Sequence, residues 1–220
     1  MFNEEMFLLM GEGLLETLYM TLMAAALSYV LGLPLGVILV VTDADGVRPC
    51  APVNRVLGTI VNALRSVPFL ILLFTVIPVT RFVTGTTIGP AATIVPLTIA
   101  AAPFIARMVE GSLKEVDRGV IEASLSMGAS PLQVVWHVLL PEALPSLING
   151  AAIATTTLLG YSAMAGICGG GGLGAIAINY GYYRGETDVM LVMVVILILV
   201  VQAFQFIGER VMRRTDKRIR

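Results

Sequence analysis

Long uncharged, predominantly apolar stretches alternate with short polar segments along this chain. Residues 17–42 and 82–106 carry no charge, residues 56–77 carry only Arg65, and no charge interrupts residues 143–183. About 20 apolar residues are enough for one helix to cross the hydrocarbon core of a membrane. We therefore predict an all-α integral membrane protein with five transmembrane helices, at residues 17–42, 56–77, 82–106, 147 to about 166, and 189–208.

Glycine and proline mark the expected interruptions. The sequence GLPLG at residues 32–36 predicts a kink in the first span, and the polar residues 43–55 predict a loop. Residues 166–174 are mostly glycine, which disfavours a helix. We expect an irregular segment there, and we favour close packing against the helices over lining the outer mouth of a pathway. It is no phosphate loop, because Lys-Ser/Thr does not follow the glycines.

Between the third and fourth spans lies a segment, residues 122–145, that changes from polar to apolar and predicts two short helices around a turn. Gly128 suits the left-handed position that ends a helix. Ser130 can cap the next helix, with Pro131 at its first position. We expect this second helix, residues 132–140, to stop near Pro141, because proline disfavours helical geometry in the residue before it.

The composition points to lipid as the solvent. Of the 220 residues, 57% are hydrophobic and only 13% are charged, whereas a soluble domain carries about 25% charged residues. The first residues are acidic where a signal peptide needs basic ones, so we expect no cleaved leader. Cys50 and Cys168 lie in separate segments, and we expect two ordinary apolar thiols with no disulfide or metal site.

The basic residues predict an orientation, because Lys and Arg are enriched in cytoplasmic segments. If the C-terminal tail lies in the cytoplasm, 12 of the 14 basic residues lie inside and only Arg81 and Arg184 lie outside. The acidic N-terminus then lies outside, and residues 122–145 face the cytoplasm. The tail carries Arg210, Arg213, Arg214, Lys217, Arg218 and Arg220.

Few side chains inside the spans could carry chemistry, and this disfavours an ion-coupled carrier. His137 follows Trp136, and we expect a partly exposed interfacial residue. Arg65, which precedes Pro68, either extends to the headgroups beside a kinked helix or places a charge at the inner mouth of a pathway. Tyr161, Ser162 and Met164 in the fourth span suit a gate and ordinary helix packing equally well.

Several motifs resemble known transport proteins. Glu122-Ala123-Ser124, then Gly128, then Val138 with Leu140-Pro141, resembles the EAA loop of binding-protein-dependent ABC importer permeases. Ser124 replaces an alanine of that pattern and Val138 replaces an isoleucine. More widely, the chain resembles the permeases of bacterial methionine importers. This wider resemblance rests on RSVP at residues 65–68, APFIAR at 102–107, LPEALP at 140–145 and GYSAM at 160–164.

This resemblance implies a single permease domain, residues 1–220, of the type I ABC importer class, with a cytoplasmic coupling loop at about residues 115–145. It implies that this chain is not an enzyme and that a separate ATPase binds ATP and Mg. For ATPase coupling it implies Glu122, Ala123, Ser124, Met127, Gly128, Pro131, Leu140 and Pro141. For the pathway or gate we single out Arg65, Tyr161, Ser162 and Met164.

The implied partners are a second copy of the chain, two ATPase subunits, a lipid-anchored methionine-binding protein and membrane lipid, with no nucleic acid and no cofactor or metal in this chain. The implied location is the bacterial inner membrane, and the implied solute is methionine, with both enantiomers carried. Three alternatives remain open: a permease for another small solute such as a polar amino acid or betaine, an ion-coupled secondary carrier or channel, and a scaffold without transport.

Overall fold

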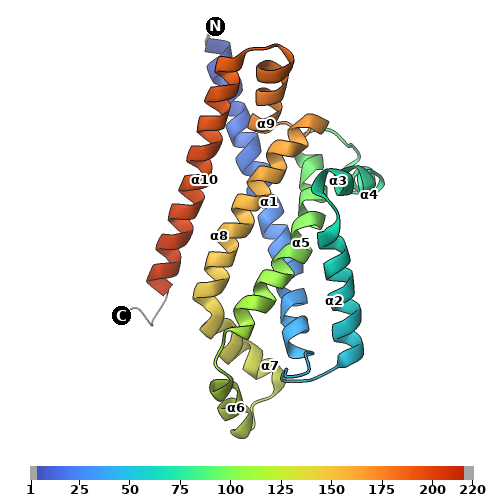
Figure 1. Ribbon diagram of the computed structural model, residues 1–220, viewed down its shortest axis with the longest axis vertical. Coiled ribbons are helices and arrows are strands. Elements are labelled where there is room, and N and C mark those ends of the chain that lie inside the picture. The colour runs from blue at the N-terminus through green and yellow to red at the C-terminus, as the bar shows by residue number, and fades with distance from the viewer. Residues whose placement is uncertain (1–3, 216–220) are drawn as a thin grey trace. The chain divides into compact units, whose positions relative to one another are not determined.

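The computed structural model describes residues 4–215, and all regular secondary structure in that range is helical. Figure 1 shows the arrangement of the helices along the chain. The longer helices are α1 (Glu4–Val41), α2 (Ala51–Ser66), α5 (Pro90–Lys114), α8 (Leu140–Ala165) and α10 (Thr187–Thr215). The shorter ones are α3 (Phe69–Thr75), α4 (Ile77–Thr84), α6 (Arg118–Ser126), α7 (Pro131–Val134) and α9 (Gly172–Ile176). The all-α prediction is confirmed.

The number of apolar helices fits the predicted five spans. Within the described residues, four segments are long and apolar enough to cross a membrane: α1, α5, Pro131–Cys168 and α10. A fifth exists if α2 and α3, which meet at an angle of 104°, form one broken span. A single helix over residues 56–77 is therefore wrong. Pro68 has an extended backbone, with ψ of 138°, and ends the helix where only a kink was considered.

Other boundaries also differ from the predicted ones. Helix α1 begins at Glu4, well before residue 17, and α10 extends to Thr215. The third span begins at Pro90, because Gly85 adopts a left-handed conformation, with φ of 73°, that ends α4. The predicted loop 43–55 is too long, since α2 already begins at Ala51. The tail residues Lys217, Arg218 and Arg220 lie outside the described residues.

The predicted helix end near Pro141 is wrong. After α7 the chain forms a π-helical turn, Val135–Leu139, and continues directly into α8. In this wider turn the N–H of Leu140 donates to the carbonyl of Val135, five residues earlier. A helix that locally widens in this way accommodates proline, which has no N–H to donate and crowds the preceding turn. The segment therefore runs as one helical stretch through Pro141 and Pro145.

Contacts divide the chain into two compact units. The first consists of residues up to Leu27 with Val67–Ala101 and Thr155–Phe206. Its core packs the start of α1 against α9 and α10, through Met10, Leu173, Ile176, Val189 and Met193. That the whole chain is a single domain remains a prediction.

The glycine-rich segment belongs to this first unit and is closely packed. Gly169, Gly171 and Gly172 have positive φ, so the backbone follows a path that other residues rarely adopt. A Cβ on Gly166 or Gly174 would collide with backbone atoms of Ala175 or Ala163. On α1, the Glu16 carboxylate accepts a hydrogen bond of 2.7 Å from the N–H of Gly172. The structure thus supports the packing interpretation of residues 166–174.

The second unit consists of Ser28–Ser66, Ala102–Ala154 and the chain from Ile207 onward. In it Leu39 of α1, Val61 of α2 and Ala106 of α5 form a small core. Two glycines let α1 approach the α5 backbone. A Cβ on Gly32 would lie 2.7 Å from the carbonyl oxygen of Ala102, and one on Gly36 would lie 2.6 Å from that of Ala106.

This contact predicts that Gly36→Ala destabilises the protein, because an added methyl group has no room against the α5 backbone. We expect a loss of about 1–3 kcal/mol in the free energy of unfolding, typical of an overpacked core. Thermal unfolding of the purified protein in detergent measures it. The matched control is Gly11→Ala on the same helix, where an added Cβ meets nothing within 4 Å. Equal melting temperatures for the two variants would contradict the prediction.

Candidate functional site

Helix α6 is a short surface helix whose two ends are fixed by local hydrogen bonds. At its start, the Asp117 side chain caps the helix and accepts a 2.6 Å bond from the N–H of Gly119. At its end, the N–H of Gly128 donates to Leu125 O at 2.9 Å and that of Ala129 to Ser124 O at 3.1 Å. Gly128 has φ of 84°. This is a Schellman arrangement, and the predicted left-handed turn at Gly128 is confirmed.

Helix α7 begins as the sequence predicted. The Ser130 hydroxyl accepts from the N–H of Gln133 at 3.4 Å, and the Gln133 side-chain oxygen accepts from the N–H of Ser130 at 2.8 Å. These reciprocal bonds form a capping box, with Pro131 at the first helical position. The turn between α6 and α7 therefore has a defined backbone path determined by its own residues.

The two short helices lie beyond the end of α5 (Figure 1) and expose most of their surface. No residue of α6 is buried. Met127 is 81% exposed, and Leu132 and Trp136 are also largely exposed. An open hollow of about 400 Å³ lies along this surface, lined by Ser124, Met127, Gly128, Ala129, Gln133, Val134, His137 and Val138. An exposed apolar surface beside a hollow is typical of a site that contacts another protein or the membrane.

The predicted coupling residues lie on α6, the Gly128 turn, α7 and the start of α8. The exposed ones are Glu122, Ala123, Met127, Gly128, Pro131 and Pro141, whereas Ser124 and Leu140 are half-buried. His137 is exposed as well, and its Nδ1 lies 3.1 Å from the carbonyl oxygen of Gln133. That position agrees with the interfacial histidine expected from the sequence.

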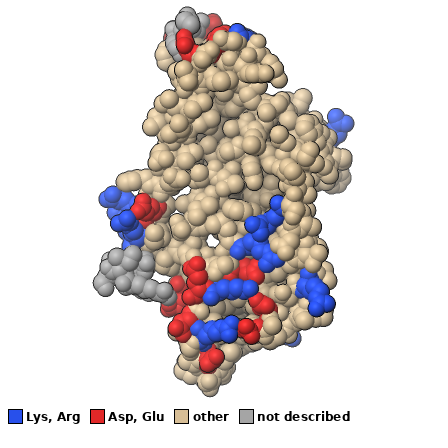
Figure 2. Space-filling model, viewed as in Figure 1, with Lys and Arg blue, Asp and Glu red and all other residues tan. Residues whose placement is uncertain are grey.

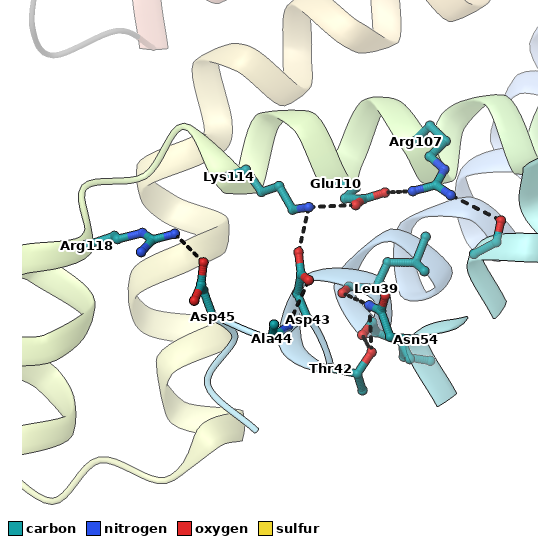
Figure 3. Close-up of polar contacts among 12 residues, drawn as sticks. Leu39, Thr42, Asp43, Ala44, Asp45, Asn54, Arg107, Glu110, Lys114 and Arg118 are labelled. Atoms are coloured by element: carbon teal, nitrogen blue, oxygen red, sulfur yellow. Dashed lines mark hydrogen bonds and ion pairs between the residues drawn. The ribbon is translucent and has the colours of Figure 1, made fainter. Parts of the chain in front are cut away.

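Next to α6, a chain of charges connects α5 to the turn that follows α1 (Figure 3). On α5, the Glu110 carboxylate is nearly buried and pairs with Arg107 at 2.5 Å and Lys114 at 2.9 Å. Lys114 also reaches Asp43, at 2.7 Å. This bond and the N–H of Ala44 hold the pKa of the Asp43 carboxyl below its ordinary value. Asp43 therefore stays ionised at neutral pH.

Two further contacts extend this network. Arg107 donates from Nη2 to the carbonyl oxygen of Gly58 on α2, at 3.1 Å. At the other end, Arg118 pairs with Asp45 at 2.9 Å. Figure 2 shows acidic and basic side chains gathered over this part of the second unit, on the face in view. The residues of the network are Asp43, Asp45, Arg107, Glu110, Lys114 and Arg118.

The pathway candidates fall into different surroundings. Tyr161 stacks on Phe69, with ring centroids 4.6 Å apart and nearly parallel planes. Ser162 is 1% exposed and donates to the carbonyl of Leu159 at 2.8 Å, as in helix packing, and its role as a gate residue stays a prediction. Met164 is 47% exposed. These three belong to the first unit, whereas Arg65 is exposed on the last turn of α2 in the second.

Sequence reasoning missed the charge network. The spacing of Arg107, Glu110 and Lys114, three and four residues apart on a helix, is a signal that could have identified the pairs within α5. The contacts of Asp43 and Asp45 join residues 71 and 73 positions apart along the chain. No local sequence pattern predicts these two contacts. The hydrogen bond between Glu16 and Gly172 was missed for the same reason.

Comparisons with known proteins identify the family of this chain. The family described as "Binding-protein-dependent transport system inner membrane component" matches residues 32–220. The probable D-methionine transport system permease protein MetI of Vibrio cholerae is 53% identical over 203 residues, 92% of this chain and 90% of that protein. The D-methionine transport system permease protein MetI of Escherichia coli K12 is 53% identical over 164 residues, 74% of this chain and 76% of that protein.

Solved structures extend the similarity to the whole fold. A chain of the inward-facing MetNI methionine ABC transporter matches with a TM-score of 0.97 and 49% identity, over 98% of this chain and all of that one. A chain of an amino acid ABC transporter solved with histidines has a TM-score of 0.78 at 21% identity, over 96% of this chain and 95% of that one; this similarity concerns the fold alone. With a family match over residues 32–220 and relatives 53% identical, the chain belongs to the family of binding-protein-dependent transport system inner membrane components.

Proposed function

We propose that this chain is the permease subunit of an ATP-driven importer and forms the membrane pathway for methionine. The observation that carries the proposal is the similarity over nearly the whole chain to a methionine ABC transporter, at 49% identity and a TM-score of 0.97. The permease relatives are described as D-methionine transport proteins. The apolar helices supply the membrane-spanning part that such a subunit needs.

In this proposal the chain hydrolyses nothing itself, and a separate ATPase subunit binds ATP and Mg. Two copies of the chain and two ATPases form the transporter, and a lipid-anchored binding protein delivers methionine. A two-fold axis, the commonest symmetry of homo-oligomers, would let two copies enclose a path together. The protein lies in the inner membrane, with its N-terminus outside and its C-terminus in the cytoplasm, because this orientation keeps 12 of 14 basic residues inside.

The proposed coupling surface consists of α6, the Gly128 turn and α7. The exposed side of α6 would enter a groove on the ATPase, as amphipathic helices commonly do. The connection onward is helical: α7, the π turn and α8 form one stretch from Pro131 to Cys168. A displacement of α7 therefore moves the start of α8, because no flexible loop lies between them. ATP-driven closure of the ATPases would in this way alternate access to the pathway.

The direct test is uptake of labelled methionine into vesicles that contain this chain and its ATPase. In vesicles whose interior corresponds to the cytoplasm, we expect uptake when ATP is inside and the binding protein is outside. Without ATP we expect no uptake. An excess of unlabelled D-methionine should compete. ATP-independent uptake driven by an ion gradient in vesicles that hold this chain alone would contradict the proposal and favour a secondary carrier.

Gly128→Asp should lower ATP-dependent uptake while the protein still inserts in the membrane. The substitution is strained because φ is 84°, and it places a carboxylate on the docking surface at the negative end of the α6 dipole. We expect a loss of about tenfold or more, the effect of roughly 1.4 kcal/mol or more. Gly85→Asp is the matched control, because Gly85 also has positive φ with open space around it. Equal uptake by both variants would refute the coupling role of Gly128.

Glu122→Lys should weaken association with the ATPase, because this exposed carboxylate lies on the proposed docking side of α6. Copurification of the tagged permease with the ATPase measures the effect, and raising the salt concentration should reduce the difference between the variants. Glu122→Gln, which keeps the shape and removes the charge, should have a smaller effect than the charge reversal. Recovery of the ATPase at the normal level with Glu122→Lys would count against a contact at this residue.

A further inference from the structure

We propose that the turn at residues 42–48 is a positioning element for α6: Asp43 and Asp45 hold the junction between α5 and α6, so that a displacement of α6 is passed to α1 and α2 as well as to α8. The inference rests on the proposed function, since it takes α6 to be the helix that the ATPase moves. It assigns a role to four residues, Asp43, Asp45, Lys114 and Arg118, that carry none in the coupling surface itself.

The two ion pairs lie on either side of one junction. Lys114 is the last residue of α5 and Arg118 is the first of α6, with three residues between them. Lys114 pairs with Asp43 at 2.7 Å and Arg118 with Asp45 at 2.9 Å. Two neighbouring carboxylates of one turn thus hold both sides of the bend (Figure 3). A change in the angle between α5 and α6 would have to move the turn or break a pair.

The turn itself is firmly joined to α1 and α2. Its backbone closes through bonds of 3.0 Å from Gly46 N to Asp43 O, from Arg48 N to Val41 O and from Cys50 N to Thr42 O. The Asn54 side chain on α2 donates to Leu39 O on α1 at 2.7 Å and lies 3.3 Å from the Thr42 hydroxyl. A force on the carboxylates therefore reaches both helices.

On α5 the network is fixed by a buried group. Glu110 is 9% exposed and pairs with both Arg107 and Lys114, and Arg107 also binds the Gly58 carbonyl on α2. A buried carboxylate between two cations strongly constrains their side chains. Lys114 is thus held on one side by Glu110 while it reaches Asp43 on the other. The pair with Glu110 therefore orients the Lys114 side chain toward the turn that carries Asp43.

The exposure of the two ion pairs indicates that they orient α6 rather than stabilise the fold. The Arg118 and Asp45 side chains are 74% and 71% exposed, and those of Lys114 and Asp43 are 47% and 36% exposed. Exposed ion pairs contribute little to folding stability. Their loss should therefore leave the fold intact and change only how the movement of α6 is transmitted. This expectation separates a positioning role from a merely structural one.

The test is the variant Asp43→Asn/Asp45→Asn in the complete transporter, which leaves α5 and α6 unchanged. Methionine uptake and ATP hydrolysis are measured in the same vesicles. We expect methionine carried per ATP hydrolysed to fall about threefold to tenfold, the range of mutations that alter coupling between sites, with normal copurification of the ATPase and an unchanged melting temperature. Asp188→Asn, which neutralises an exposed carboxylate at the start of α10, is the control and should behave as wild type.

A charge exchange gives a second test. Asp45→Arg and Arg118→Asp should each lower the ratio of uptake to hydrolysis, and the double variant should restore most of it. An unchanged ratio in Asp43→Asn/Asp45→Asn would overturn the proposal, and so would a fall accompanied by lower melting temperature and lost ATPase binding. If wild-type vesicles carry no methionine with ATP, the proposed function fails instead, which distinguishes the two failures.

Discussion

A bilayer offers no hydrogen-bond partner to a broken helix, and this constraint decides where the chain can depart from helical structure. The glycine-rich segment departs from helical structure and finds its hydrogen-bond partners on α1. The N–H groups that follow the glycine turn donate to Glu16 and Thr17 of α1, at 2.7 and 2.9 Å. In the segments that the proposed orientation places in the cytoplasm, Ser130 likewise caps the start of α7, and Asn54 binds the end of α1. At these places polar side chains complete the backbone hydrogen bonds where helices begin or end.

The proposed coupling segment is joined to its flanking helices in two different ways. On the α8 side the connection is a continuous helix, and the π turn before Pro141 preserves that continuity despite two prolines. On the α5 side the chain bends at Val116 and Asp117, and charged side chains cross the bend. A continuous helix transmits a displacement without an intervening loop. Ion pairs transmit it only while they hold, and they are weakened by salt where they are exposed.

The sequence predicted the features that depend on neighbouring residues. Gly128 permits the left-handed turn, Ser130 caps the next helix and Pro131 suits its first position, so the end of α6 and the start of α7 were correctly predicted. Predictions failed where a residue's effect depends on its surroundings. Pro141 does not end a helix because a π turn precedes it, and Pro68 breaks one completely. The contact of Asp43 with Lys114 exists only once α1 and α5 are packed through Gly32 and Gly36.

The break at Pro68 also bears on α8. Phe69, the first residue after the break, stacks on Tyr161 with ring planes 2° from parallel. Phe69 is buried, and so is Ser162, the neighbour of Tyr161 on α8. Parallel aromatic stacking requires particular ring positions, so α8 cannot rotate at Tyr161 without displacing the start of α3. A short helix that begins at a proline break can follow such a movement, because α2 does not continue into it.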